Sequence, residues 1–256
     1  MSKKILEFSS DLIKNNIKND YKLEPVFFSV YAFFSINVNR YSNQGMISVR
    51  KIYKYLSYKQ FKRNATFYKV IESIKELEKR KMIILHNISL EELDKIPFNT
   101  AIEYEFTNSF YDREGFTTLS YEYFHYIFES DNLIVKKENA FLVLLYLASH
   151  IWVRAKGDYK DIDLRPEATY GTYNYLSKKI GLSYKTVYNC VEYLTSEWNE
   201  HKPILKTKVC KLVLDEDNVI NCPTIYAYNT KEADTEIEWC EKLLLKNKLK
   251  FYKELN

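Results

Sequence analysis

Apolar residues recur every three or four positions in one segment of the first half of the chain. After Asn64-Ala65-Thr66 they share one face of a helix, at Phe67, Val70, Ile71, Ile74 and Leu77. The segment 26–39 is instead apolar almost all round, which is typical of a helix buried on every side. These patterns predict an amphipathic helix that begins near Asn64 and a buried helix with Pro25 in its first turn.

The rest of the first half predicts a shorter helix and a β-hairpin. Ser48 is a favourable N-cap for a helix over 49–56, after a break at 43–45. Residues 82–85 and 101–106 have the composition of strands. The acidic segment Ser89–Asn99 between them is expected to loop out.

The second half repeats this order of elements. A strongly apolar helix is predicted from Lys136 to about Trp152, as the counterpart of the helix at 26–39. A helix over 173–180 and a turn at Gly181-Leu182 follow. Ser183 then serves as the N-cap of a helix that extends to about Trp198.

The last part of the chain predicts a second hairpin and a C-terminal helix. The hairpin joins strands at 204–214 and 219–228 through the acidic turn 215–218. Residues 232–255 place Ile237, Cys240 and three leucines in helical phase. We expect this amphipathic helix to cap the second domain or to form a dimer.

Two segments, 53–74 and 173–194, match without a gap at an offset of 120 residues. Such a period is too long for a solenoid repeat and suits a duplicated domain. We therefore expect an α+β, mostly α, protein with two similar domains at 1–115 and 136–230, a connector at 116–135 and the C-terminal helix at 231–256. The identical positions are Tyr53/Tyr173, Tyr55/Tyr175, Leu56/Leu176, Ser57/Ser177, Lys59/Lys179, Thr66/Thr186, Tyr68/Tyr188 and Glu72/Glu192.

Composition argues against several classes of protein. The longest apolar segment, 140–148, is too short to span a membrane, and the N-terminal residues lack the features of a signal peptide. The four cysteines contain no C-x-x-C pair, so we expect reduced thiols in a cytoplasmic protein.

No catalytic constellation is visible either. The phosphate-binding pattern G-x-x-x-x-G-K does not occur. The histidines are scattered without the spacing of metal ligands. We therefore expect no enzymatic activity, no metal and no cofactor. The four histidines are His86, His125, His150 and His201.

Charge is distributed unevenly along the chain, although the net charge is only +4. Residues 1–90 carry a net charge of +10 and residues 136–214 a net charge of +5, whereas residues 91–135 carry −8 and residues 215–256 carry −3. The two basic blocks contain the two matching segments. This coincidence is expected if both domains approach a polyanion.

The segment Leu176–Leu194 carries the clearest chemical signal. Gly181 permits a left-handed turn between two helices, and Ser183 satisfies free amides at the start of the second helix. That helix N-terminus favours a phosphate, and its outward residues reach base edges in a major groove. The outward residues are Tyr184, Lys185, Thr186 and Asn189.

This segment resembles the winged helix-turn-helix superfamily, and the resemblance extends to about 60 residues with the hairpin. The first domain departs from the pattern, because Phe61 replaces the turn glycine and Arg63 replaces the cap serine. Two tandem winged helices in a chain of this length are similar to replication initiators of plasmids and phages of low-G·C Gram-positive bacteria. The resemblance implies sequence-specific binding of duplex DNA, repression of the chain's own promoter and contacts with host replication proteins.

The residues that we expect to contact DNA come from both domains. In the second domain they include lysines of the hairpin, and in the first domain they surround the start of the amphipathic helix. The set is Ser183, Tyr184, Lys185, Thr186, Asn189, Lys206 and Lys208 in the second domain, and Arg63, Asn64, Tyr68 and Lys69 in the first.

Two alternatives remain open at this point. A dedicated transcription regulator needs the same contacts as an initiator. A winged helix can also be a protein-interaction module, here one of a mobile element that binds a host protein. Both expected wing tips are acidic, at 91–94 and 215–217, which argues against wings that insert into a minor groove.

Overall fold

The computed structural model describes residues 5–14, 16, 23–39, 41–56, 58, 61–107, 116–129, 135–151, 165–197, 202–213 and 219–255. The chain has mixed α and β structure and divides into two compact units, residues 1–145 (unit 1) and 146–256 (unit 2). No helix in these ranges is long and apolar enough to cross a membrane. The expected acidic turn at 215–218 lies outside them.

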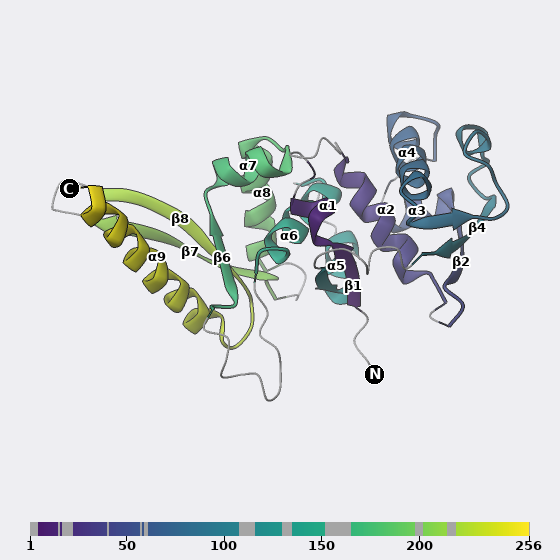
Figure 1. Ribbon diagram of the computed structural model, residues 1–256. Coiled ribbons are helices and arrows are strands. Elements are labelled where there is room, and N and C mark those ends of the chain that lie inside the picture. The colour runs from purple at the N-terminus through teal and green to yellow at the C-terminus, as the bar shows by residue number, and fades with distance from the viewer. Residues whose placement is uncertain are drawn as a thin grey trace. The chain divides into compact units, whose positions relative to one another are not determined.

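Helices and a three-stranded antiparallel sheet form the main part of unit 1 (Figure 1). The strand order is β2-β4-β3. The expected break is confirmed at Asn43, which has a left-handed φ of 54°, but Gln44 and Gly45 belong to β2. The elements are α2 (Pro25–Ile36), β2 (Gln44–Ser48), α3 (Val49–Tyr55), α4 (Ala65–Lys79), β3 (Ile83–Leu85) and β4 (Ala101–Phe106).

The core of unit 1 lies between these helices and one face of the sheet. Helix α2 is buried from Val26 to Phe34, as its uniform apolar composition predicted. Helix α4 buries the predicted stripe, from Phe67 to Leu77. Tyr104 joins sheet to helix, because its hydroxyl donates to the Phe34 carbonyl at 2.7 Å.

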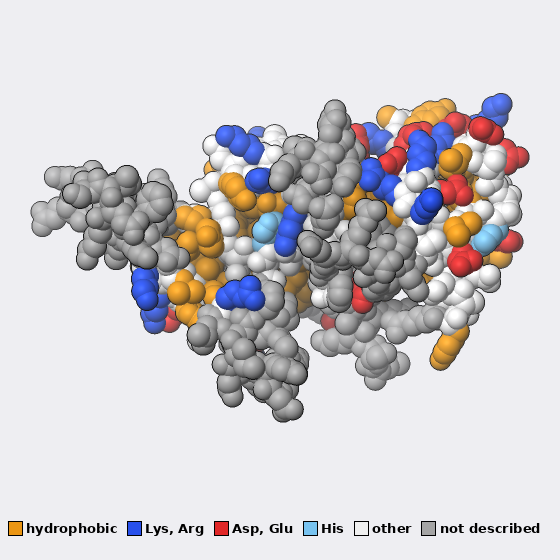
Figure 2. All heavy atoms as spheres, in the orientation of Figure 1, with side chains coloured by type: hydrophobic (Ala, Val, Ile, Leu, Met, Phe, Trp, Pro, Cys, Tyr) orange, Lys and Arg blue, Asp and Glu red, His pale blue; other side chains and the backbone are white. Residues whose placement is uncertain are grey.

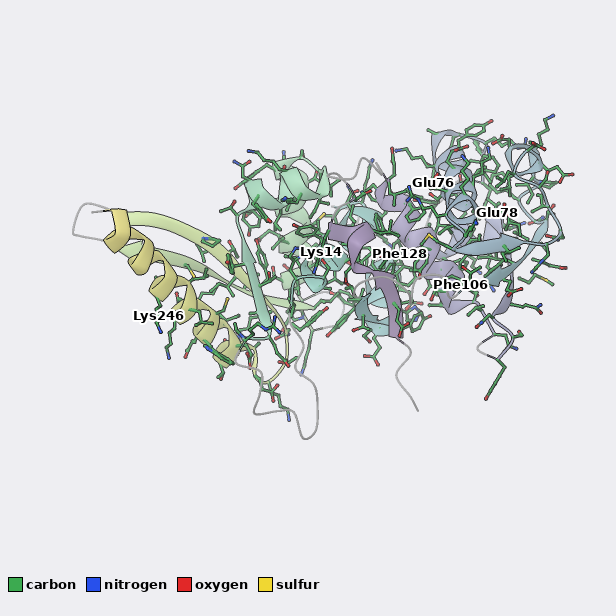
Figure 3. The ribbon with its side chains drawn as sticks, viewed as in Figure 1. Lys14, Glu76, Glu78, Phe106, Phe128 and Lys246 are labelled. Carbon is green, nitrogen blue, oxygen red and sulfur yellow. The ribbon has the colours of Figure 1, made fainter. Side chains whose placement is uncertain are left out.

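The segment expected as a connector contains regular structure. Strand β5 (Phe116–Ser120) pairs antiparallel with β1 (Ile5–Ser9), and α5 (Tyr121–Glu129) follows it. Helix α1 (Ser10–Lys14) follows β1 directly. The Phe128 ring, labelled in Figure 3, lies 4.7 Å from the Phe124 ring and 5.9 Å from that of Phe141.

The acidic segment 89–99 does not loop out. It contains a single 3-10 turn, η1 (Glu92–Lys95), which packs against α4. Leu93 and Ile96 are buried there, and Lys75 of α4 lies 2.8 Å from a carboxylate oxygen of Asp94. The expectation of a protruding loop was wrong. Among the charged residues of this segment, the side chains of Leu93 and Ile96 are apolar and pack into the core of unit 1.

Unit 2 contains a second three-stranded antiparallel sheet, with the strand order β6-β8-β7. The final residues of α6 (Lys137–Ala148), from Tyr146 onward, belong to this unit. The two predicted helices and the hairpin are present, and β6 is an additional strand. The remaining elements are β6 (Ala168–Gly171), α7 (Tyr173–Ile180), α8 (Tyr184–Thr195), β7 (Leu205–Val213), β8 (Val219–Tyr228) and α9 (Ala233–Leu255).

One order of elements therefore occurs twice along the chain. The first series is α2-β2-α3-α4-β3-β4, and the second is α6-β6-α7-α8-β7-β8. Each has the order helix, strand, helix, helix, strand, strand. In each sheet the first strand of the series pairs with the last, which lies in the centre. The topology supports the duplication that the matching segments suggested.

The ungapped match holds for the second helix of each pair. Matched positions in α4 and α8 have the same burial, since both tyrosines at 68 and 188 and both glutamates at 72 and 192 are exposed. The apolar pairs between them are all buried, namely Phe67/Val187, Val70/Cys190, Ile71/Val191 and Ile74/Leu194.

The same match is wrong for the first helix of each pair. Tyr53 lies near the end of α3, whereas Tyr173 is the first residue of α7. Alignment of the N-caps Ser48 and Thr172 shifts the offset to 124 residues. The shift arises because nine residues separate α3 from α4, but only three separate α7 from α8.

Helix α9 covers one face of the sheet in unit 2 (Figure 1). Its side chains Ile237, Cys240 and Leu244 pack on Ile225 and Ala227 of β8, together with Ala168 and Cys210. Lys246, labelled in Figure 3, is exposed. The sheet of the same unit thus covers most of the apolar stripe seen in the sequence, as the capping alternative required, but Leu243 of that stripe is exposed.

Candidate nucleic-acid interface

Local hydrogen bonds fix the turn between α7 and α8. The Thr172 hydroxyl caps α7 by accepting the Tyr175 amide at 3.1 Å. Gly181 ends the helix with φ of 78°, a left-handed conformation that other residues rarely adopt. The Ser177 hydroxyl then donates to the Leu182 carbonyl at 2.7 Å. The turn glycine predicted from the sequence is confirmed.

Ser183 begins α8 as its N-cap, also as predicted. Its Oγ accepts the Thr186 amide at 3.1 Å and lies 2.8 Å from the Thr186 Oγ1. Both hydroxyls are therefore engaged in capping. Their contribution to a ligand site is to hold the first turn of α8, whose amides favour an anion.

The outer face of α8 is aromatic and basic at its N-terminal end. Tyr184 and Lys185 are exposed, with Tyr184 at 52% exposure. Asn189 is half-buried one turn later, and Glu192 is the first acidic residue of the helix. An anionic ligand would meet this end of α8 without carboxylate repulsion.

Tyr188 also lies on this face, although it is not among the residues predicted to contact DNA. It is 42% exposed, and its ring centroid is 5.4 Å from that of Tyr173. The Tyr184 ring lies 5.8 Å from the same Tyr173 ring. Burial raises the pKa of the Tyr173 phenol, which stays neutral. Helical spacing could have identified Tyr188, which follows Tyr184 by four residues.

The two hairpin lysines expected at the interface point to α9 instead. Lys206 Nζ lies 2.6 Å from Asp234 Oδ2, and Lys208 forms an ion pair with Glu241. The Glu241 carboxylate holds the pKa of Lys208 above its ordinary value. Because strand residues alternate between faces, both lysines share the sheet face of Cys210, which α9 covers.

In unit 1, the residues at the start of α4 are largely engaged within the unit. The Arg63 guanidinium donates to the carbonyls of Lys95 at 2.5 Å and Ile96 at 3.1 Å. The Asn64 side chain caps α4 by accepting the Phe67 amide at 3.1 Å. The cap thus lies one residue after Arg63, the position aligned with the cap serine.

The other two predicted residues of unit 1 are exposed on α4. None of residues 61–67, which precede Tyr68, is acidic. The next residue, Lys69, forms an ion pair with Glu24. Farther along the helix, Glu72 bonds Lys75 at 3.0 Å and Glu76 bonds Arg80 at 2.7 Å. The exposed side of α4 is therefore of mixed charge, unlike the start of α8.

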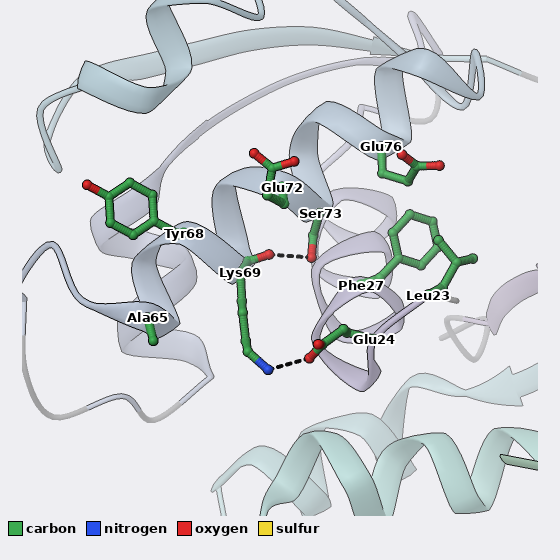
Figure 4. A pocket seen from close by; sticks show the side chains of 9 residues that line it. All are labelled: Leu23, Glu24, Phe27, Ala65, Tyr68, Lys69, Glu72, Ser73 and Glu76. Carbon is green, nitrogen blue, oxygen red and sulfur yellow. Dashed lines mark hydrogen bonds and ion pairs between the residues drawn. The ribbon is translucent and has the colours of Figure 1, made fainter. Parts of the chain in front are cut away.

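A groove of about 490 Å³ runs along this side of α4 (Figure 4). Leu23 and Phe27 supply apolar surface, and Lys69 and Glu24 meet across it. Three glutamates line the groove against a single lysine, which disfavours a polyanion there. The full lining is Leu23, Glu24, Phe27, Ala65, Tyr68, Lys69, Glu72, Ser73 and Glu76.

Figure 2 shows the same contrast on the face it displays. Red and blue side chains intermix over the part of unit 1 that contains α4, whereas blue side chains lie over α7 without red ones beside them. The exposed lysines of α7 are Lys178 and Lys179. Together with Lys185 they make this end of unit 2 the more basic candidate surface.

Neither metal chemistry nor a known family provides a further assignment. Within the described ranges, no group of three or more histidine, cysteine, aspartate or glutamate residues could hold a metal ion. Cys190, Cys210 and Cys240 are buried free thiols. The sequence matches no protein-family model and shows no significant match to a curated protein.

Proposed function

We propose that the chain binds duplex DNA sequence-specifically through two tandem winged-helix domains, with α8 as the principal reading helix. The exposed N-terminal end of α8 carries this proposal. It combines a capped helix start, Lys185, two tyrosines and Asn189 with no acidic residue before Glu192. Such an end favours phosphates and supplies hydrogen-bonding side chains to base edges.

The repeated topology supports the winged-helix assignment. In a winged helix, a strand between the first and second helices pairs with the hairpin that follows the third helix. The strand orders β2-β4-β3 and β6-β8-β7 have this arrangement. By this assignment α4 and α8 are the equivalent reading helices.

The two helices then have unequal roles. Arg63 and Lys69, two of the basic residues expected at DNA, are bonded within unit 1, whereas Lys185 belongs to no ion pair that the structure describes. We assign sequence recognition to α8 and an auxiliary contact to α4 through Tyr68. The resemblance to replication initiators extends the proposal to initiation at an origin and to repression of the chain's own promoter. A dedicated transcription regulator would use the same contacts.

The test is electrophoretic mobility shift with the promoter region of the chain's own gene, over a series of salt concentrations. Affinity should fall steeply as salt rises, because phosphate contacts release counterions. Lys185→Ala combined with Asn189→Ala should lower specific affinity by about tenfold or more and should reduce the salt slope by about one. Failure to bind any duplex at low salt would contradict DNA binding.

A matched control is Lys242→Ala, which removes an exposed lysine from α9. It changes the net charge as Lys185→Ala does, but at a position outside α8. Equal losses in the two variants would mean that net charge alone determines affinity and that α8 is not the reader. Urea unfolding of each variant confirms that the fold is intact.

The acidic groove of unit 1 supports a second function of another class. Its three glutamates, beside the apolar edges of Leu23 and Phe27, suit a basic helix of a partner protein whose cations compete with Lys69, Lys75 and Arg80 for those carboxylates. This function would make unit 1 a protein-interaction module, for example toward host replication proteins, while unit 2 binds DNA. Glu72→Lys combined with Glu76→Lys should abolish binding of a basic amphipathic probe peptide and leave duplex binding by α8 intact. Unchanged peptide binding would contradict it.

A further inference from the structure

A second cleft lies on unit 2, on the side of α7 that carries Tyr175. Its volume is about 620 Å³, within the range of sites that hold small molecules. The end of α6, the edge strand β6 and the start of α7 form its walls. Its aromatic lining consists of Tyr146, His150, Tyr170 and Tyr175.

Aromatic rings dominate this cleft. Tyr170 and Tyr175 are 54% and 47% exposed, so much of their ring surface is accessible to a ligand. The buried Tyr146 ring also lines the cleft, 4.5 Å from the ring of His150. Burial raises the pKa of the Tyr146 phenol, and the neighbouring Tyr175 phenol adds to this effect. Exposed rings of this kind favour a planar partner that stacks on them.

Positive charge accompanies the rings. Lys179 Nζ lies 5.6 Å from the centroid of the Tyr175 ring, and Lys178 is exposed on the same helix. Neither the cleft lining nor α7 contains an acidic residue. A planar ligand with a negative charge attached to it would complement both features.

The groove on unit 1 provides an internal comparison. It has a similar volume, but it is lined by three glutamates and contains one exposed tyrosine, Tyr68. The cleft on unit 2 has three tyrosines and a histidine and no carboxylate. The first set of groups suits a basic peptide, whereas the second suits a nucleobase and its phosphate.

We propose that this cleft binds an unpaired nucleobase of single-stranded DNA, with the base stacked on Tyr170 and Tyr175 and the adjacent phosphate at Lys179. Bases of a duplex are stacked on both faces by their neighbours, so half-exposed rings in a cleft are accessible only to unpaired bases. The site goes beyond duplex recognition, because none of its residues lies on α8 and only Lys179 also belongs to the basic surface described for the duplex.

The test measures fluorescence anisotropy of a labelled thymidine oligonucleotide of about ten nucleotides with the full chain. Tyr170→Leu and Tyr175→Leu should each weaken binding by about tenfold, because they keep apolar bulk and remove the stacking surface. Tyr175→Phe keeps the ring and should retain most of the affinity. Lys179→Ala should weaken binding chiefly at low salt.

Tyr41→Leu is the matched control, since it removes an exposed tyrosine that lies neither in the cleft nor on α8. It should leave single-strand binding unchanged. If Tyr41→Leu and Tyr170→Leu lower single-strand affinity equally, the cleft is not the site. Unchanged affinity in both Tyr170→Leu and Tyr175→Leu would also overturn the proposal, whether or not the duplex binds to α8.

Binding of other ligands distinguishes a single-strand site from a mononucleotide site and from a peptide site. Thymidine monophosphate should bind far more weakly than the oligonucleotide, because one nucleotide offers only one base and one phosphate. Equal affinity would show a mononucleotide site and overturn the single-strand proposal. Competition by an uncharged aromatic peptide as strong as that by the oligonucleotide would overturn it as well, and would indicate a peptide site.

Discussion

Lys206 of β7 and Asp234 at the start of α9 form an ion pair, with 2.6 Å between Nζ and Oδ2. The two residues are separated by 28 positions in the sequence and join the sheet of unit 2 to the helix that covers it. Lys208 and Glu241 make a parallel contact. Lys206 and Lys208, which the sequence predicted to contact DNA, are thus both paired with carboxylates of the same unit.

Asp234→Asn should make Lys206 available to phosphates and raise duplex affinity by about threefold at low salt. The pair is solvent-exposed, so its loss should change the free energy of unfolding by less than about 1 kcal/mol. Salt titration of DNA binding and urea unfolding measure the two effects. The control Glu232→Gln makes the same charge change just before α9 at an exposed carboxylate. An equal gain in the control would mean that Lys206 itself is not involved.

Adjacent leucines of α9 should differ sharply in their effect on stability. Leu244 is 7% exposed and packs on the sheet, whereas Leu243 is 36% exposed. Leu244→Ala should therefore lower the free energy of unfolding of unit 2 by about 2–4 kcal/mol, and Leu243→Ala by less than about 1 kcal/mol. Chemical denaturation followed by circular dichroism gives both values. Similar losses would indicate that α9 does not pack in this orientation.

Gly45 should be intolerant of any side chain. A Cβ atom there would lie 2.3 Å from Cζ of the buried Tyr104, whose hydroxyl is bonded to Phe34. Gly45→Ala should destabilise unit 1 by about 1–3 kcal/mol through this overlap. At Gly171 a Cβ would lie 3.4 Å from Tyr175, an ordinary contact, so Gly171→Ala serves as the control. Thermal unfolding of both variants tests the difference, and equal melting temperatures would refute the close approach.

Stability should fall in alkaline solution partly because of Cys240. Burial raises the pKa of its thiol from 9.0 to about 11. Below pH 9 the thiol is protonated in both states, so its contribution is fully present there. Between pH 9 and about 11 only the unfolded chain releases the proton, and the free energy of unfolding decreases as pH rises.

Cys240→Ala isolates this contribution from that of the buried tyrosines, whose pKa values are also raised, as at Tyr104 and Tyr226. The wild-type chain should lose stability more steeply than the variant as pH rises from about 8 to about 11. Urea unfolding over that range measures both slopes. Parallel slopes would show that the Cys240 thiol is not buried in the folded state.

Local signals in the sequence determined the helices and their caps. Phe67, Val70, Ile71, Ile74 and Leu77 specify the inner face of α4 by spacing alone, and the structure buries all five. Gly181 and Ser183 could be assigned because a left-handed turn and an N-cap depend on residues within one turn of helix. Tyr184 and Lys185 on the outer face follow from the same period.

Contacts between segments that are distant in the sequence could not be predicted from these local patterns. The short strands β2 and β6 have too few residues to show an alternating pattern, and they exist because β4 and β8 pair with them. The shared tyrosines at 53 and 173 suggested equivalent positions in the first helices. The longer turn before α4 places them at opposite ends of those helices.

The sequence by itself determined the order of helices and hairpins, the core faces and the cap of α8, because each depends on neighbours within a few residues. Only the tertiary structure decided which charges remain available. It pairs Lys69 with Glu24 and Lys206 with Asp234, and it gathers Tyr170 and Tyr175 beside Tyr146. Ion pairs and clefts form between segments that only the fold brings together, so no local pattern encodes them.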